Sequence, residues 1–118
     1  MKVLCAEDEK MCQTAIKGFC KKMDIEVDLA DNGQEALEFC KKETAYTFIL
    51  MDMYMPELNG LQAAESIRGL GHGSTYKIYL LTGAEEFSEE DAKKSGFDGL
   101  IRKPLSKKAF EDLVALFK

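Results

Sequence analysis

Short apolar runs alternate along the chain with longer segments in which apolar residues recur at helical spacing. Five runs rich in Val, Ile, Leu and Tyr predict strands at Lys2–Ala6, Glu26–Ala30, Phe48–Met51, Lys77–Leu81 and Gly99–Ile101. Several of these runs are apolar at nearly every position, which is typical of strands buried on both faces of a parallel sheet. The pattern therefore favours a sheet that is covered by helices on both sides.

Helix-period segments lie between the strands. The apolar residues of the first segment form one stripe: Cys12, Ala15, Ile16, Phe19, Cys20 and Met23. Three later segments have the same spacing, with inward-facing residues Ala36, Leu37 and Cys40; Leu61, Ala64 and Ile67; and Phe110, Leu113, Val114 and Phe117. Asn32 with Glu35, and Ser88 with Asp91, indicate the starts of the second helix and of a short, polar fourth helix, and Ser106 is suited to cap the last.

Five strands that alternate with five helices predict an α/β fold with a parallel sheet between two helical layers. Right-handed crossovers make the three-layer, flavodoxin-like (βα)5 arrangement the simplest solution, with strand order 2-1-3-4-5. The length of 118 residues fits one domain, residues 1–118. Ligands of such folds bind outside the carboxyl ends of the strands, near the switch point between strands 1 and 3.

The composition excludes several classes of protein. The net charge is −5, and no stripe of Lys and Arg runs against it, so direct nucleic-acid binding is disfavoured. No apolar run approaches the roughly 20 residues that span a bilayer, so membrane insertion is not expected. The segment Met1–Ala6 is followed at once by acidic residues and is too short for a signal peptide.

The cysteines do not indicate a zinc site. Cys5, Cys12, Cys20 and Cys40 form no C-x-x-C pair, and His72 is the only histidine. Buried, reduced thiols are the simpler interpretation, and they fit a cytoplasmic location.

Three carboxylates follow two of the predicted strands. Glu7 and Asp8 come directly after the first strand, and Asp52 ends the third. These strands are neighbours in the predicted order, so the three side chains are expected to converge in one crevice. Like charges at close range repel, and Mg²⁺ would offset that repulsion with the oxygen ligands it prefers. The alternatives are that Asp8 caps the first helix and that Asp52 is a turn acid before Pro56.

Two further strand ends carry groups that suit a phosphoryl ligand. Thr82 ends the fourth strand, and Lys103, followed by Pro104, comes just after the fifth. A hydroxyl and an ammonium can hold phosphoryl oxygens on a carboxylate. Taken separately, Thr82 is explained as an ordinary strand-end residue, and Lys103 is explained as a solvated charge. The combination of acids, a hydroxyl and a lysine at the ends of four strands is harder to explain by chance than any one of these residues.

This set of residues resembles the receiver domain of two-component response regulators, of the chemotaxis-regulator (CheY-like) type. The resemblance covers essentially the whole chain, and "MDMYMPELNG" at residues 51–60 is its most specific segment. It implies that Asp52 is the phosphoacceptor and takes a phosphoryl group from phosphohistidine. It also implies that Asp8, Glu7, Asp52 and the backbone carbonyl of Tyr54 bind Mg²⁺, for which Mn²⁺ is an acceptable substitute.

The resemblance assigns the remaining roles as well. Lys103 would pair with a phosphoryl oxygen, Thr82 would donate its hydroxyl to another, and the N–H groups of Met53 and Gly83 would be further donors. Movement of Thr82 would switch a surface formed by the fourth helix, fifth strand and fifth helix, where a downstream protein docks. The partners implied are a histidine kinase or a histidine phosphotransfer protein, and the domain is a signalling module and not an enzyme.

The chain departs from the family at a few positions. Glu7 stands where the family often has aspartate, and Leu100 stands where it usually has an aromatic residue that swings with the threonine. Tyr54 and Ala84 occupy positions that control the access of hydrolytic water, which predicts slow loss of the phosphoryl group.

Three other functions remain as alternatives. The substitution at Leu100 keeps open a receiver-like interaction module that is never phosphorylated. An aspartyl-nucleophile phosphohydrolase of the haloacid dehalogenase type would need a second acid where this chain has Tyr54. A flavin carrier with the same topology would need a phosphate-binding loop where Glu7, Asp8 and Glu9 stand.

Overall fold

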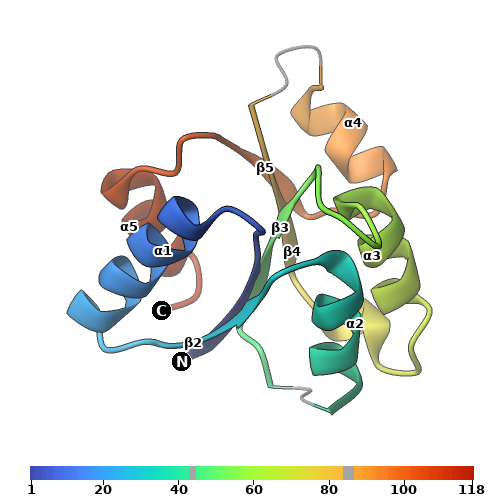
Figure 1. The fold of residues 1–118 in the computed structure, drawn as a ribbon, viewed down its shortest axis with the longest axis horizontal. Helices are drawn as coiled ribbons and strands as arrows, with labels where there is room; N and C mark the ends of the chain where they lie inside the picture. The colour runs from blue at the N-terminus through green and yellow to red at the C-terminus, as the bar shows by residue number, and fades with distance from the viewer. Residues whose placement is uncertain (43–44, 84–86) are drawn as a thin grey trace.

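The computed structural model describes residues 1–42, 45–83 and 87–118 (Figure 1). The strands are β1 (Lys2–Ala6), β2 (Glu26–Ala30), β3 (Phe48–Asp52), β4 (Ile78–Thr82) and β5 (Gly99–Arg102). The helices are α1 (Lys10–Lys22), α2 (Gly33–Lys42), α3 (Gly60–Arg68), α4 (Glu89–Lys94) and α5 (Lys107–Ala115), with a 3₁₀ turn η1 at Gly73–Thr75. No helix among the described residues is long and apolar enough to cross a membrane.

The strands form one parallel sheet in the order β2-β1-β3-β4-β5, as the sequence predicts. Helices α1 and α5 cover one face, and α2, α3 and α4 cover the other (Figure 1). Strand residues alternate between the two cores. Phe48 and Leu50 of β3 pack on the α1 and α5 side, whereas Ile49 and Met51 pack on the opposite side. This double burial explains why the central strands are apolar at nearly every position.

The strand ends differ slightly from those predicted. β3 includes Asp52, β5 includes Arg102, and β4 lies one residue later than predicted, so that Thr82 is its last residue. These polar residues remain in the ladder because the sheet bonds involve the main chain: the N–H of Lys103 donates to the carbonyl of Thr82 at 3.1 Å.

The predicted helix starts are confirmed by hydrogen bonds. Asn32 Oδ1 accepts from the N–H of Glu35 at 2.8 Å, and Ser106 Oγ accepts from the N–H of Ala109 at 3.0 Å. Ser88 forms a complete capping box with Asp91, and Asn59 forms one with Gln62 that the sequence analysis did not identify. The predicted stripe of α1 is wrong at one position. Ala15 is exposed and Gln13 is buried instead, because the amide of Gln13 finds hydrogen-bond partners in the fold.

The turn after β3 requires glycine at position 60. The N–H of Gly60 donates to the carbonyl of Met53 at 2.8 Å, and a Cβ here would lie 2.3 Å from the carbonyl oxygen of Asp52. We expect Gly60→Ala to lower the free energy of unfolding by about 1–3 kcal/mol, because main-chain atoms of β3 must move. Urea denaturation measures this change.

Gly18 provides a matched control for that substitution. It lies in α1, and nothing stands within 4 Å of a Cβ added there. Gly18→Ala should therefore hold or raise stability by up to about 1 kcal/mol, since alanine favours helix. Equal stability of the Gly60→Ala variant and the unmodified chain would contradict the account of this turn.

Candidate functional site

Four strands deliver polar residues to one edge of the sheet. Asp52 and Thr82 are the last residues of β3 and β4, Glu7 directly follows β1, and Lys103 directly follows β5. All strands are parallel, so these ends lie on the same side, and β1 and β3 are paired neighbours. The sheet order therefore brings together residues that lie far apart in sequence, at the position where such folds bind ligands.

The three predicted carboxylates converge. Oxygen atoms of Glu7, Asp8 and Asp52 lie within 4.8 Å of one another. Glu7 is fully buried and Asp52 is 5% exposed, whereas Asp8 faces solvent. The helix-cap alternative for Asp8 is wrong, because the residue that precedes α1 is Glu9, whose side chain makes no capping bond. Asp52 belongs to β3 and is not a turn residue.

Lys103 closes the acidic cluster. Its Nζ lies 3.0 Å from Asp52 Oδ1 and 2.9 Å from Glu7 Oε2, and its side chain is 25% exposed. It donates a hydrogen bond to Glu7 Oε1 at 3.2 Å. The contact with Glu7 Oε2 is close enough for an ion pair, but Oε2 receives no directed hydrogen bond from any described residue. Lys103 thus provides one positive charge for two buried carboxylates.

The ionisation of these groups reflects burial and pairing. Burial raises the pKa of Glu7, and the negative charge of Asp52 acts in the same direction, while Lys103 lowers it. Burial alone would lower the pKa of Lys103, but its hydrogen bonds and ion pairs with Glu7 and Asp52 raise that pKa above its ordinary value. Lys103 is therefore charged at neutral pH.

The donor set fits a hard divalent cation. Glu7 Oε2 is a buried oxygen without a directed hydrogen bond among the described residues, and the neighbouring donors are the carboxylates of Asp8 and Asp52. Oxygen ligands of this kind suit Mg²⁺, which also retains several waters, and the exposed position of Asp8 leaves room for them. The side chain of Tyr54 is 68% exposed.

The polar residue at the end of β4 lies beside this cluster. Thr82 is buried, and its Oγ1 donates to Met53 Sδ at 3.7 Å. Leu100 of β5 is half-buried, pairs with Leu80 and packs against the core on the α2, α3 and α4 side. Gly83 is exposed. Ala84, which the sequence analysis associated with water access, lies outside the described residues.

One predicted phosphoryl donor, the N–H of Met53, forms a main-chain hydrogen bond in this structure. The N–H of Met53 donates to the carbonyl of Leu81 at 3.1 Å, so the β3–β4 ladder already uses it. The N–H of Tyr54 forms no hydrogen bond with any described residue, so it is a further candidate donor.

Two residues near the carboxylates were missed by sequence reasoning. The N–H of Glu9 donates to Glu7 Oε1 at 3.2 Å, and the side chain of Gln13 bonds the main chain of Glu7. The only local signal for Gln13 is a glutamine on the inner side of an amphipathic helix. It was missed because the inner side was assigned from the apolar residues alone.

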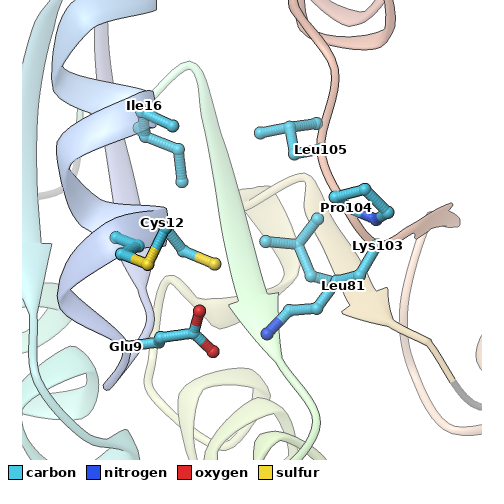
Figure 2. A pocket seen from close by; sticks show the side chains of 9 residues that line it. Glu9, Cys12, Ile16, Leu81, Lys103, Pro104 and Leu105 are labelled. Carbon is cyan, nitrogen blue, oxygen red and sulfur yellow. The ribbon is translucent and has the colours of Figure 1, made fainter.

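An apolar groove adjoins the cluster (Figure 2). Cys12 and Ile16 of α1 face Pro104 and Leu105 across it, and Leu81 forms its floor. Glu9 and Lys103 lie at the end of the groove nearest the carboxylates. Met11, which also lines it, is 80% exposed. The groove therefore offers apolar contacts to whatever approaches the cluster from the α1 side.

The protein is a parallel α/β domain with a cluster of carboxylates, suited to bind a metal, at the switch point between β1 and β3. The sequence assigns this domain to one family. Residues 3–115 match the model of the response regulator receiver domain, and the chain belongs to this family, whose members act in two-component signal transduction.

Three relatives illustrate the match. The transcriptional regulatory protein SrrA of Staphylococcus aureus is 35% identical over 104 residues, which are 88% of this chain and 42% of SrrA. The chain thus spans less than half the length of this curated relative.

Two solved structures superpose closely. The receiver domain of sensor histidine kinase PA1611 from Pseudomonas aeruginosa PAO1, with a magnesium ion coordinated in its active-site cleft, has a TM-score of 0.88 and 26% identity, covering 98% of this chain and 95% of that one. The receiver domain of Ssk1 from Saccharomyces cerevisiae, solved with the histidine phosphotransfer protein Ypd1, has a TM-score of 0.89 and 29% identity, covering 99% and 88%.

Proposed function

We propose that residues 1–118 act as one phosphoacceptor receiver domain, which takes a phosphoryl group from phosphohistidine onto Asp52 in a two-component or phosphorelay system. The observation that carries this proposal is the placement of Asp52. Its carboxylate ends a central strand, contacts Lys103 at 3.0 Å and lies beside two further carboxylates that can hold a metal. The domain is proposed to be a signalling module that catalyses at most its own phosphorylation and dephosphorylation.

Asp52 provides the nucleophile. One oxygen of its carboxylate would attack phosphorus, the N–P bond of the phosphohistidine would break, and its electron pair would stay on the imidazole nitrogen, which then takes up a proton. Glu7, Asp8, Asp52 and the Tyr54 carbonyl would hold Mg²⁺, or Mn²⁺ in its place. When bound, the ion offsets charge on the transferring group.

Side-chain and main-chain groups would then hold the product. Lys103 contacts Asp52 Oδ1, from which it would move to a phosphoryl oxygen. Thr82 would donate its hydroxyl to a second oxygen, and its present acceptor, a methionine sulfur, is weak enough to be exchanged. The amides of Gly83 and Met53 would be further donors, and the amide of Tyr54 is added to them here. Thr82 and Leu100 would transmit the change to the partner surface.

The proposed donor is a histidine kinase or a histidine phosphotransfer protein. The relative Ssk1 is known in complex with such a protein, Ypd1. A donor must cover the surroundings of Asp52 to reach it, and the groove beside Lys103 offers apolar contacts there. The downstream protein is proposed to dock on α4, β5 and α5, where a second groove is lined by residues of all three elements, among them Glu89, Leu100 and Leu113.

The proposal also concerns where the domain works. We place it in the cytoplasm, where thiols stay reduced, and Cys5, Cys12, Cys20 and Cys40 are free in the structure. Nucleic acid and membrane are not among its proposed partners.

A second candidate function is a receiver-like module that needs no phosphorylation. The half-buried Leu100 favours it, because leucine there packs against the core and replaces the aromatic residue that swings in the family. The paired, metal-competent carboxylates favour phosphorylation instead.

The experiment that tests the proposed function is intact mass spectrometry after incubation with acetyl phosphate or a phosphorylated histidine phosphotransfer protein, with and without Mg²⁺. We expect a gain of one phosphoryl group only with Mg²⁺, and its loss in hydroxylamine, which cleaves acyl phosphates. No gain with either donor would contradict the proposal and favour the phosphorylation-independent module.

A further inference from the structure

The loop that follows β1 carries two of the proposed metal ligands, Glu7 and Asp8. Asp8 is exposed, and no described residue forms a hydrogen bond or ion pair with its carboxylate. Its direction therefore depends on the backbone at Glu7 and Asp8. An anchor on that backbone would determine how well the carboxylates of Glu7, Asp8 and Asp52 converge.

Two hydrogen bonds hold this backbone from neighbouring elements. The N–H of Glu7 donates to the carbonyl of Ala30 at 3.0 Å, as an extension of the β1–β2 ladder. The carbonyl of Glu7 accepts from Gln13 Nε2 at 2.6 Å. The first bond fixes the peptide group before Glu7, and the second fixes the peptide group that joins Glu7 to Asp8. The orientation of the latter group sets where Asp8 points.

Gln13 is well placed to act as this anchor. It is 7% exposed on the inner side of α1, and its Nε2 also donates to Asp31 Oδ1 at 2.7 Å. The two protons of the amide nitrogen thus have two acceptors, one after β1 and one after β2. Gln13 Oε1 lies 3.5 Å from Lys10 Nζ, which also contacts Asp31 at 3.4 Å. Both ends of the amide are fixed, so Gln13 cannot turn without breaking a bond.

We infer that Gln13 is a positioning residue for the divalent cation: it orients the Glu7–Asp8 peptide so that the carboxylates meet around the ion. This inference rests on the proposed function, because it concerns the same metal site. Gln13 does not touch the ion and acts through the main-chain carbonyl of Glu7. Outer partners of this kind typically change metal affinity by about 10- to 100-fold when they are removed.

Isothermal titration of Mg²⁺ into the unphosphorylated protein tests the inference without any measurement of phosphorylation. Gln13→Met keeps the size of the side chain and removes the donor. We expect it to raise the dissociation constant for Mg²⁺ by about 10-fold or more, and to shift the ¹H–¹⁵N signals of Asp8 and Glu9.

Two further variants separate positioning from a merely structural role. Gln62→Met breaks the capping box of α3 and should lower stability without changing Mg²⁺ affinity. Asp31→Ala removes one anchor of Gln13 at an exposed position and should weaken Mg²⁺ binding in the same direction by a smaller factor. The Asp31 variant also keeps the inference testable if Gln13→Met does not fold.

The two levels of proposal fail in different ways. Wild-type affinity in Gln13→Met, or in Asp31→Ala if the former is unfolded, would overturn the role of Gln13 and leave the proposed function standing. Absence of Mg²⁺ binding by the wild-type protein would overturn the metal site itself.

Discussion

The Asp52→Asn variant is expected to gain no phosphoryl group from acetyl phosphate under conditions in which the wild-type protein is modified. The carboxamide keeps the shape of the side chain but is a poor nucleophile and cannot form an acyl phosphate. The fold should tolerate the change, because Lys103 keeps its contacts with Glu7 and the repulsion between the two buried carboxylates is removed. Intact mass measures the modification, and urea denaturation measures the stability.

Asp28→Asn is the matched control for this substitution. Asp28 lies in β2, where it accepts from the Tyr46 hydroxyl at 2.6 Å and contacts Lys2 at 3.5 Å, away from the acidic cluster. Phosphorylation of this variant should equal that of the wild type. A phosphoryl group retained in Asp52→Asn would show that another residue accepts it, and peptide mapping would then identify that residue.

Replacing Lys103 by methionine is expected to destabilise the metal-free protein by about 2–4 kcal/mol at neutral pH, since removal of one partner leaves two buried carboxylates without their cation. The estimate is below the range for fully buried pairs because the lysine side chain is 25% exposed. Urea denaturation of both proteins in EDTA measures the difference. Lys108→Met is the control, because Lys108 pairs with Asp112 on the surface and should contribute well under about 1 kcal/mol.

The loss in Lys103→Met should depend on pH in a defined direction. Burial raises the pKa of Glu7 above its ordinary value, and Lys103 opposes that rise. Without Lys103 the folded protein binds the Glu7 proton more tightly than the unfolded chain does. The contribution of Glu7 to stability is then complete below its unfolded pKa and is lost as pH rises through the raised folded value. The free energy of unfolding of the variant should therefore lie closer to that of the wild-type protein at pH 4 than at pH 7.

Mg²⁺ should recover much of the stability of the Lys103→Met variant. A cation that binds only the folded state adds about 2.7 kcal/mol at a free concentration of 100 times its dissociation constant. The recovery should be larger in the variant than in the wild type, where Lys103 already balances the carboxylates. Equal stability of the two proteins at every pH and Mg²⁺ concentration would mean that the close contacts of Lys103 contribute nothing to folding.

Much of the fold was predictable because its signals are local. The run Phe48–Met51, which is apolar on both faces, indicates a central strand, and Ser88 with Asp91 indicates a helix start. Each pattern follows from the geometry of a few adjacent residues. The convergence of Glu7, Asp8 and Asp52 was predictable once the strand order had been predicted, since parallel strands in a known order place their carboxyl ends at one edge of the sheet.

Two other features could not be predicted from patterns of adjacent residues. The sequence did not show that the N–H of Met53, a predicted phosphoryl donor, bonds to the carbonyl of Leu81 where β3 pairs with β4. The stripe on α1 suggested Ala15 as a core residue, but the rotation of the helix places Gln13 inside and leaves Ala15 exposed. Pairing between strands and helix rotation depend on contacts across the whole domain, which periodicity does not record.

The sequence by itself determined the order of strands and helices, the caps and the set of strand ends that carry acids, a hydroxyl and a lysine. The tertiary structure alone decided which of these groups touch. Lys103 meets Glu7 across 96 positions of sequence and also meets Asp52, and Gln13 holds the carbonyl of Glu7. The physical reason is that local patterns fix each element's conformation, whereas hydrogen bonds and ion pairs between elements require atoms to lie within about 3 Å, a condition that only the packed sheet and helices satisfy.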